Sequence, residues 1–178
     1  MTRTWAPETF ETGALKAVFG TFTTGVVIVT TRGPTGLTCQ TFCPLSLDPP
    51  LVGVAVAGDS SSGARLRAEG VACFNILDRT AEPLARRFGT PGVNRFTGLD
   101  WRPSPVLGLP LLDRTLAWVE ATITDDITVG DHHLLVARVA GLGASRPGSP
   151  LTFFRGRFQS LPGDETPADQ VRRTDFER

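Results

Sequence analysis

Residues 36–52 read GLTCQTFCPLSLDPPLV, a hydroxyl-rich extended run that ends at Asp48-Pro49-Pro50. Proline fixes its own φ angle and lacks a backbone N–H, so this triplet predicts the end of a strand over residues 37–45. The β-branched and apolar residues 51–57 then predict the next strand. The stretch therefore predicts two consecutive strands in a domain that is mainly β.

The rest of the chain adds further short strands and a few helices. Apolar residues at helical spacing predict a first helix over residues 8–20, with Gly25 as its stop. The serine cluster 60–62 predicts a helix N-cap, and Gly70 predicts the end of that helix. Further strands are expected over 26–31, 71–77, 118–125, 133–144 and 151–161, a short helix over 80–88 and a long loop over 89–110. Short strands at this frequency favour a barrel over a doubly wound sheet.

Length and charge restrict the class of protein. The 178 residues predict one domain over residues 1–161, followed by a polar tail over 162–178 that is mobile or orders only against a partner. Lys plus Arg equals Asp plus Glu at 18 each, so no net field attracts nucleic acid or an anionic membrane surface. No apolar run is long enough to span a bilayer, and the start of the chain has no signal-peptide pattern. Three cysteines suit reduced thiols, and a cytoplasmic location is expected.

Common nucleotide, metal and hydrolase motifs are missing from the sequence. The chain contains neither a G-x-G-x-x-G run after a strand nor a P-loop, so neither a Rossmann fold nor a P-loop fold is supported. Cys39 and Cys43 are four residues apart on an expected strand, roughly 13 Å at about 3.3 Å per residue, which is too far for one zinc ion. No G-x-S-x-G elbow supports a hydrolase triad. No metal site is expected.

Four short segments outside the opening stretch carry side chains suited to binding or chemistry. They are Ser60-Ser61-Ser62, Arg95-Phe96, Gly130-Asp131-His132 and Phe154-Arg155-Gly156-Arg157-Phe158. A helix start with three hydroxyls is a ready phosphate site, and a histidine in a tight turn beside an aspartate can be held in one orientation. Each segment also has a plain structural explanation, as a helix cap, a solvated loop charge or a surface turn.

In this order and at these separations, the segments resemble the short-chain flavin reductases of the FMN-binding split-barrel superfamily, over residues 15–161. The resemblance implies a split β-barrel with Greek-key-like connections and short helices. Gln40 stands where that family usually has a shorter polar residue, and Pro44 replaces a usual serine and removes one N–H donor.

The resemblance also implies the residues of a site. His132 faces the flavin and contacts the nicotinamide, and the strand with Thr38 lies along the flavin, although its threonines also suit an ordinary half-buried strand. The helix start holds the flavin phosphate, and Arg95 approaches a flavin or nicotinamide phosphate. The flavin-binding residues implied are Thr38, Cys39, Gln40, Thr41, Ser46, Ser60, Ser61, Ser62, Arg95, Phe96 and Arg155.

Three functions remain open at this point. The first is an NAD(P)H:flavin oxidoreductase that releases reduced flavin to a separate monooxygenase. The second is a split-barrel flavoprotein that keeps its flavin and oxidises or reduces a small metabolite. The third, a non-enzymatic β-barrel interaction module, leaves the order of the motifs unexplained. The sequence does not choose between FMN and FAD or between NADH and NADPH. The resemblance further implies a homodimer with its site near the interface.

The number of cations near the expected phosphate site favours the first function. The helix start at Ser60 is a weak positive pole, and Arg95 with help from Arg155 adds the charge. Contacts this sparse favour micromolar flavin binding, about −8 kcal/mol, as a protein that hands over its product requires.

Overall fold

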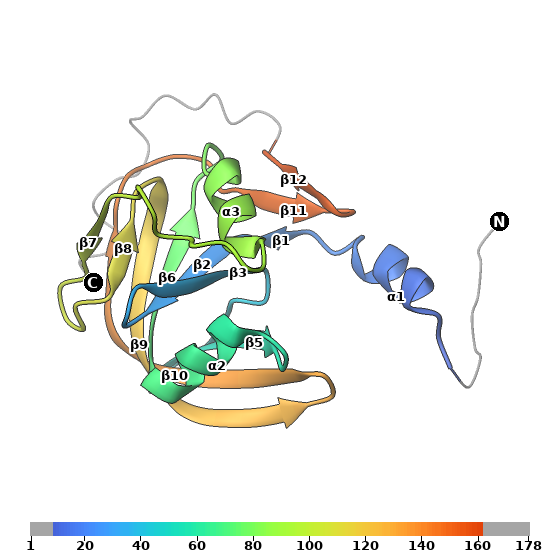
Figure 1. Ribbon diagram of the computed structural model, residues 1–178, viewed down its shortest axis with the longest axis horizontal. Coiled ribbons are helices and arrows are strands. Elements are labelled where there is room, and N and C mark those ends of the chain that lie inside the picture. Colours follow the sequence, from blue (N-terminus) through green and yellow to red (C-terminus); the bar gives the residue numbers. More distant parts are fainter. Residues whose placement is uncertain (1–8, 162–178) are drawn as a thin grey trace.

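The computed structural model describes residues 9–161, and its centre is a seven-stranded antiparallel sheet (Figure 1). The strand order in this sheet is β3-β2-β6-β9-β10-β5-β4, so β3 and β4 lie at opposite ends of it. Its members are β2 (Val27–Thr31), β3 (Thr35–Cys39), β4 (Cys43–Leu47), β5 (Pro50–Ala57), β6 (Val71–Leu77), β9 (Thr115–Val129) and β10 (His132–Ala144). The expected mainly β fold with short helices is confirmed.

Two small sheets and three helices complete the described part of the chain. The first sheet contains β1 (Thr24–Gly25), β11 (Thr152–Phe154) and β12 (Arg157–Gln159), and the second contains β7 (Trp101–Pro103) and β8 (Pro110–Leu112). The helices are α1 (Thr12–Phe19), α2 (Ser61–Glu69) and α3 (Glu82–Gly89). None of the helices within residues 9–161 is long and apolar enough to cross a membrane. The expected polar tail, residues 162–178, lies outside the described residues.

The predicted single strand over residues 37–45 is wrong, because the chain leaves the sheet between Cys39 and Cys43. The side chain of Thr41 lies in this break, where its hydroxyl donates to Ala55 O at 2.9 Å and accepts from Ala55 N at 3.0 Å. Thr41 thereby joins the crossing segment to β5. The sheet curls so that β3 and β5 come to line one space, which is the physical basis of the split barrel.

Other expected boundaries also change. The first helix begins at Thr12 rather than at residue 8 and ends at Phe19, close to the expected residue 20; its C-cap is Gly20, and Gly25 lies in β1. The strand expected over 151–161 is a hairpin, β11 and β12, with a turn at Arg155 and Gly156. The long loop over 89–110 contains the short strand β7. By contrast, α2 begins after the cap residue Ser60, as expected from the serine cluster.

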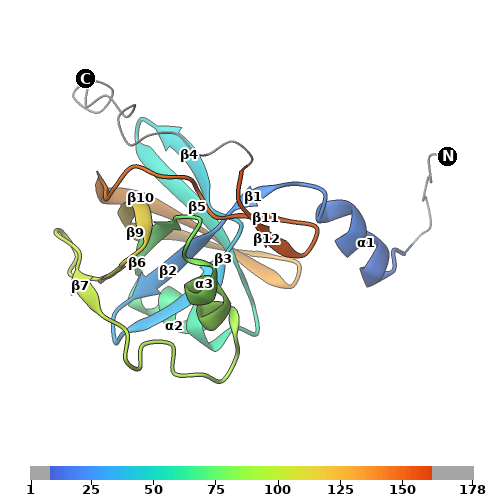
Figure 2. The same ribbon diagram turned by 90° about the horizontal axis from the view of Figure 1, so that it is seen from above.

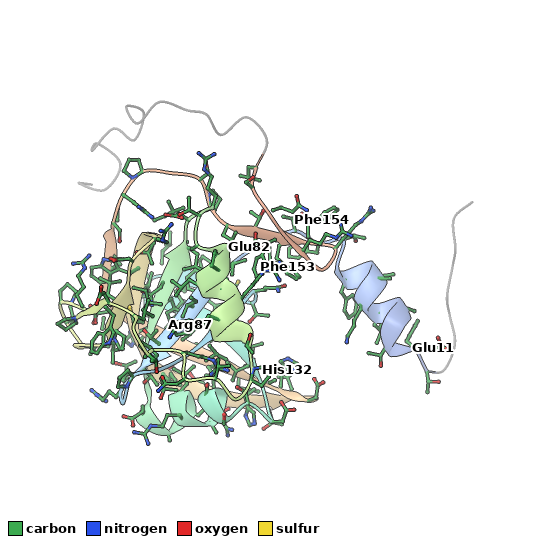
Figure 3. The ribbon with its side chains drawn as sticks, turned by 45° about the horizontal axis from the view of Figure 1, so that its top comes forward. Glu11, Glu82, Arg87, His132, Phe153 and Phe154 are labelled. Carbon is green, nitrogen blue, oxygen red and sulfur yellow. The ribbon has the colours of Figure 1, made fainter. Side chains whose placement is uncertain are left out.

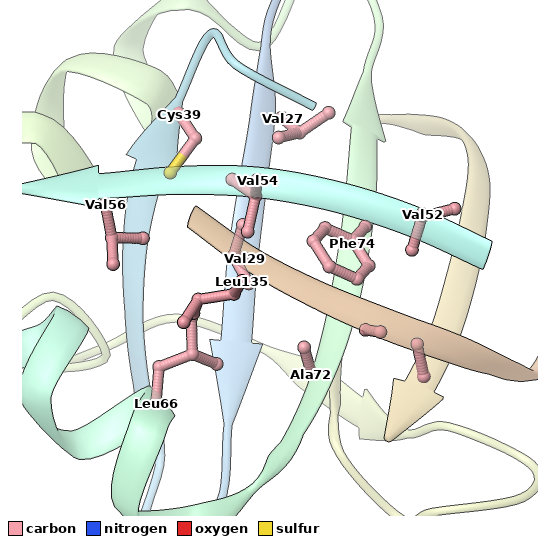
Figure 4. Packing of buried hydrophobic residues seen from close by; sticks show 12 residues of the cluster. Val27, Val29, Cys39, Val52, Val54, Val56, Leu66, Ala72, Phe74 and Leu135 are labelled. Carbon is pink, nitrogen blue, oxygen red and sulfur yellow. The ribbon is translucent and has the colours of Figure 1, made fainter. Parts of the chain in front are cut away.

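Apolar side chains from both halves of the curled sheet fill the barrel (Figure 4). Phe74 of β6 is central, with its ring centroid 5.2 Å from that of Phe42. The cluster comprises Val27, Val29, Cys39, Val52, Val54, Val56, Leu66, Ala72, Phe74, Ala121, Leu135 and Ala137. Because Leu66 belongs to α2, burial of this cluster also fixes that helix against the barrel.

A second feature of the interior is the buried carboxylate of Glu120 on β9, which is 0% exposed. Its two oxygens accept hydrogen bonds from Ser104 Oγ at 2.5 Å, Val106 N at 3.0 Å and Leu107 N at 2.5 Å. A buried charge is stable only when such donors replace water. Glu120 therefore holds the loop between β7 and β8 onto the sheet.

The helix α1 stands apart from the barrel in both ribbon views (Figures 1 and 2). None of its residues is buried, and Phe19 is 68% exposed. Phe22, just after the helix, is 75% exposed. The backbone bond from Arg155 N to Gly20 O, 2.7 Å long, connects the end of α1 to the β11–β12 turn. An eight-residue helix without buried contacts is marginal by itself.

Candidate functional site

A cavity of about 800 Å³ lies between the edge strand β3 and the end of β5. One wall is β3 with the crossing residues 40–41, and the opposite wall is the end of β5 with the start of α2. The third side is the segment from Phe88 to Arg95, and His132 at the start of β10 closes the rim. Figure 3 shows His132 on the side of the molecule that carries α2.

Most of the expected site residues meet at this cavity, although they come from four separate elements. Its lining includes Thr38, Cys39, Gln40, Thr41, Ser60, Ser61, Ser62, Arg95 and His132. The lining also includes residues that the sequence analysis did not select, among them Ala55, Ala57, Asp59 and Asn94. The alanines alternate along β5, and their small side chains leave room beside the strand. No local sequence pattern indicated that the loop residues Asp59 and Asn94 would line a cavity.

Three expected residues, Ser46, Phe96 and Arg155, do not line this cavity. Ser46 belongs to β4, the far edge strand of the sheet, because the chain crosses over after Cys39. The ring of Phe96 packs against Phe88, with centroids 5.1 Å apart. The guanidinium of Arg155 lies over its neighbour Phe154, 5.1 Å from the ring centroid.

Two threonine hydroxyls that were expected to meet a ligand are used within the protein. Thr38 Oγ1 donates to Ala85 O of α3 at 2.7 Å, and Thr41 bonds to β5 as described above. These threonines therefore fix the cavity walls, and the main chain of this segment remains for ligand contacts. Between them, burial raises the pKa of the Cys39 thiol to about 12, so the thiol stays protonated and is no nucleophile.

The start of α2 lies on the wall of the cavity and carries three serines. Ser60 caps the helix, and its hydroxyl accepts from Gly63 N at 3.0 Å. Backbone N–H groups at a helix start point outward and carry a partial positive charge. The hydroxyls of Ser61 and Ser62 lie in the same turn, on the cavity wall.

Arg95 brings a full positive charge to this helix start. Its Nη1 donates to Gly36 O at 3.0 Å and to Ser62 Oγ, and its Nη2 donates to Thr90 O at 3.0 Å. The Nε atom is buried and has no hydrogen-bond partner among the described residues. A buried donor without a partner is uncommon in proteins.

His132 is oriented by its neighbour, as the sequence predicted. The Nδ1 atom lies 2.6 Å from Asp131 Oδ1, which leaves Nε2 on the other side of the ring. This hydrogen bond from His132 lowers the pKa of the Asp131 carboxyl, which stays ionised at neutral pH. His133 makes a separate pair, with Nδ1 2.7 Å from Asp126 Oδ1. No group of side chains within residues 9–161 is suited to holding a metal ion.

Comparison with known proteins then identifies the family. The profile of the "Flavin reductase like domain" matches residues 19–162. The chain belongs to the flavin reductase family. It is 36% identical over 164 residues to the reductase subunit HsaB of a flavin-dependent monooxygenase from Rhodococcus jostii, covering 90% of this chain and 84% of that protein. It is 33% identical to an NADH-dependent FAD reductase of Streptomyces globisporus, covering 84% and 86%.

Solved structures of flavin reductases agree with the fold. The chain superimposes on nitrilotriacetate monooxygenase component B from Mycobacterium thermoresistibile with a TM-score of 0.82 at 37% identity, covering 93% of this chain and 94% of that one. An NADH:FAD oxidoreductase from Streptomyces globisporus, solved with NAD and FAD fragments, gives a TM-score of 0.79 at 31% identity and covers 85% and 93%. The split barrel expected from the resemblance is therefore confirmed.

Proposed function

We propose that this flavin reductase oxidises NADH, reduces FMN or FAD, and releases the reduced flavin to a partner monooxygenase. The observation that carries the proposal is one cavity lined by the start of α2, by the partly buried Arg95 and by His132. The similarity to HsaB, a monooxygenase reductase subunit, supports the partner class.

The residues present fit a flavin. The cavity of about 800 Å³ is within the range of about 300–1,000 Å³ common for small-molecule sites. Ser61, Ser62 and Arg95 would hold the flavin phosphate, and the main chain from Thr38 to Thr41 would face the ring. When flavin and nicotinamide are bound, hydride transfer between their rings is the cofactors' own chemistry.

The protein's part in this reaction is to position and shield the two rings. His132 stands on the rim, 45% exposed and held by Asp131, where it would contact the nicotinamide from one side. The apolar wall from Ala55 to Ala57 would exclude water from the other side. Holding two reactants in the right geometry can lower a reaction barrier by about 7–11 kcal/mol.

We infer NADH rather than NADPH as the reductant, because two similar proteins are named for NADH, a flavin reductase of Kitasatospora aureofaciens and an FAD reductase of Streptomyces globisporus. A cytoplasmic location suits the three cysteines, all of which are free thiols.

Steady-state assays with the four combinations of FMN or FAD and NADH or NADPH test this function. We expect oxidation of NADH that rises with added flavin until saturation, and much of the bound flavin to be lost on gel filtration. Flavin that stays stoichiometric through dialysis, with no response to added flavin, would instead support the flavoprotein that keeps its cofactor. No flavin-dependent oxidation in any combination would contradict both.

We also propose that the protein is a homodimer in which α1 packs on the second subunit. The described part of one chain offers α1 no buried contact, and large apolar side chains are exposed both near α1 and on the edge strand β4. Phe19 is 68% exposed and Leu47 is 95% exposed. Apolar exposure on this scale is typical of an interface.

Light scattering at micromolar concentration is expected to give twice the mass of one chain. Phe19→Glu should raise the dimer dissociation constant at least tenfold, because burial of a phenylalanine contributes about 1.5–3 kcal/mol. The control is Lys16→Glu, which adds negative charge at a polar position of the same helix and should leave the dimer intact. A monomeric wild type with full activity would disprove the dimer proposal.

A further inference from the structure

His133, the second of the chain's two histidines, belongs to a chain of polar contacts outside the main cavity. Its side chain is 17% exposed and its Nδ1 atom lies 2.7 Å from Asp126 Oδ1. The other oxygen of the same carboxylate, Asp126 Oδ2, accepts from Arg67 Nε at 2.6 Å. One carboxylate thus joins a histidine on β10 to an arginine on α2. The hydrogen bond from Arg67 is the main reason that the pKa of Asp126 is lowered.

The two ends of this contact chain belong to the two sides of the flavin cavity. Arg67 lies in the last turn of α2, whose first turn carries the serines of the phosphate site. Asp126 and His133 lie on the β9–β10 hairpin, whose tip carries His132. A second connection runs from Gly58 N to Asp131 O at 2.9 Å. An added side chain at Gly58 would lie 3.8 Å from the His133 ring, so this ring also packs against the segment that leads into α2.

The position of the β9–β10 hairpin depends on the Arg67–Asp126–His133 contacts more than the position of α2 does. Pairing between β6 and β9 stops at Thr122, so the outer half of β9 is an edge with exposed side chains from Thr124 to Val129. The start of α2, in contrast, is held independently by the Ser60 cap and by Arg95. Loss of the contact chain would therefore free the hairpin tip while the phosphate site stays in place.

We propose that Arg67, Asp126 and His133 form a positioning network that holds His132 across the cavity from α2 and thereby sets the affinity for the nicotinamide. This inference rests on the proposed function, in which His132 contacts that ring. None of the three residues needs to touch a cofactor, because the network acts by fixing the position of the β9–β10 hairpin, which carries His132. Asp126 is the residue to test, since its carboxylate makes both contacts.

The experiment compares Asp126→Ala with wild type in steady-state kinetics and flavin titration. We expect the KM for NADH to rise at least fivefold, whereas kcat and the flavin Kd stay within twofold. Asp126→Asn, which keeps one oxygen acceptor, should recover part of the NADH affinity. Asp125→Ala is the matched control: it removes the same charge from the same strand, but among the described residues the Asp125 side chain accepts a hydrogen bond only from its neighbour Thr124.

A double-mutant cycle with His132→Ala separates positioning from a general effect on the fold. If the network acts through His132, Asp126→Ala should add less than twofold to the KM for NADH in the His132→Ala background. Independent, fully additive effects would overturn the proposal, as would equal effects of Asp125→Ala and Asp126→Ala.

Amide hydrogen exchange on the protein without cofactors gives a readout that does not depend on activity. In Asp126→Ala we expect exchange at residues 127–133 to accelerate at least fivefold, with the amides of α2 unchanged. Unchanged exchange at the hairpin tip would overturn the network. If the exchange prediction held but the wild type failed to oxidise NADH, the proposed function would be wrong, whereas the structural role of the Arg67–Asp126–His133 contacts would stand.

Discussion

Glu120→Ala is expected to lower the free energy of unfolding by about 4 kcal/mol. The carboxylate is 0% exposed and accepts hydrogen bonds from one hydroxyl and two backbone N–H groups, of Ser104, Val106 and Leu107. Each buried donor left without a partner costs about 1–3 kcal/mol, so three donors together reach the expected value even if one of them regains water. Urea denaturation followed by tryptophan fluorescence measures the change.

Two further variants show whether the hydrogen bonds or the lost volume are responsible. Glu120→Gln keeps the shape but replaces one acceptor oxygen with an NH₂ group, and we expect about half of the loss. Glu82→Ala removes a carboxylate that is 42% exposed and paired with Arg86, and it should change stability by less than about 0.5 kcal/mol. If the free energy of unfolding of Glu120→Ala were within about 1 kcal/mol of the wild-type value, the loop between β7 and β8 would not depend on Glu120.

Local signals in the sequence predicted the parts of the fold that are decided locally. The helix over α2 was expected from its cap and its stop, and in the structure Ser60 accepts from Gly63 N while Gly70 adopts a left-handed φ of 67°. Both the cap and the left-handed stop depend on residues within one helical turn, so they can be predicted from one sequence. The orienting pair of Asp131 and His132 is equally local and was predicted for the same reason.

The break between β3 and β4 could not be predicted in this way. Most of residues 37–47 have strand-forming side chains. The crossing at residues 40–42 is stabilised by contacts of Thr41 with Ala55, which lies on a strand fourteen residues away. The crossing also separates two expected site residues. Ser46 was expected to bind flavin together with Thr38, but it lies on β4, at the opposite edge of the sheet from β3.

The sequence predicted that Arg95 belongs to the site, but it did not show which contacts hold the side chain there. The family resemblance indicated a cation near a phosphate, but no local pattern shows that this side chain bonds to β3, α2 and the loop before it. These contacts join segments up to fifty-nine residues apart. Phe96, its neighbour in the sequence, was assigned with it and packs on α3 instead.

Arg95→Ala is expected to raise the flavin Kd by roughly thirtyfold, or about 2 kcal/mol. A hydrogen bond to a charged group contributes about 1.5–3 kcal/mol, and Arg95 lines the cavity beside Ser62. The proposed acceptor is the flavin phosphate at the start of α2, next to Ser62. Quenching of flavin fluorescence in a titration measures Kd, and riboflavin, which has no phosphate, should bind the variant and the wild type with similar affinity.

Two controls separate the charge from the support that Arg95 gives to its loop. Arg95→Lys keeps the positive charge but not the fork of donors, so we expect a loss of roughly fivefold to tenfold. Arg87→Ala removes an arginine that bonds to Asn94 O and Thr97 O of the same loop but lies outside the flavin cavity. If Arg87→Ala weakened FMN binding as much as Arg95→Ala, the loop and not the guanidinium would be responsible. If riboflavin binding fell together with FMN binding in Arg95→Ala, the phosphate assignment would be wrong, because the lost contact would then be with the ring or the ribityl chain.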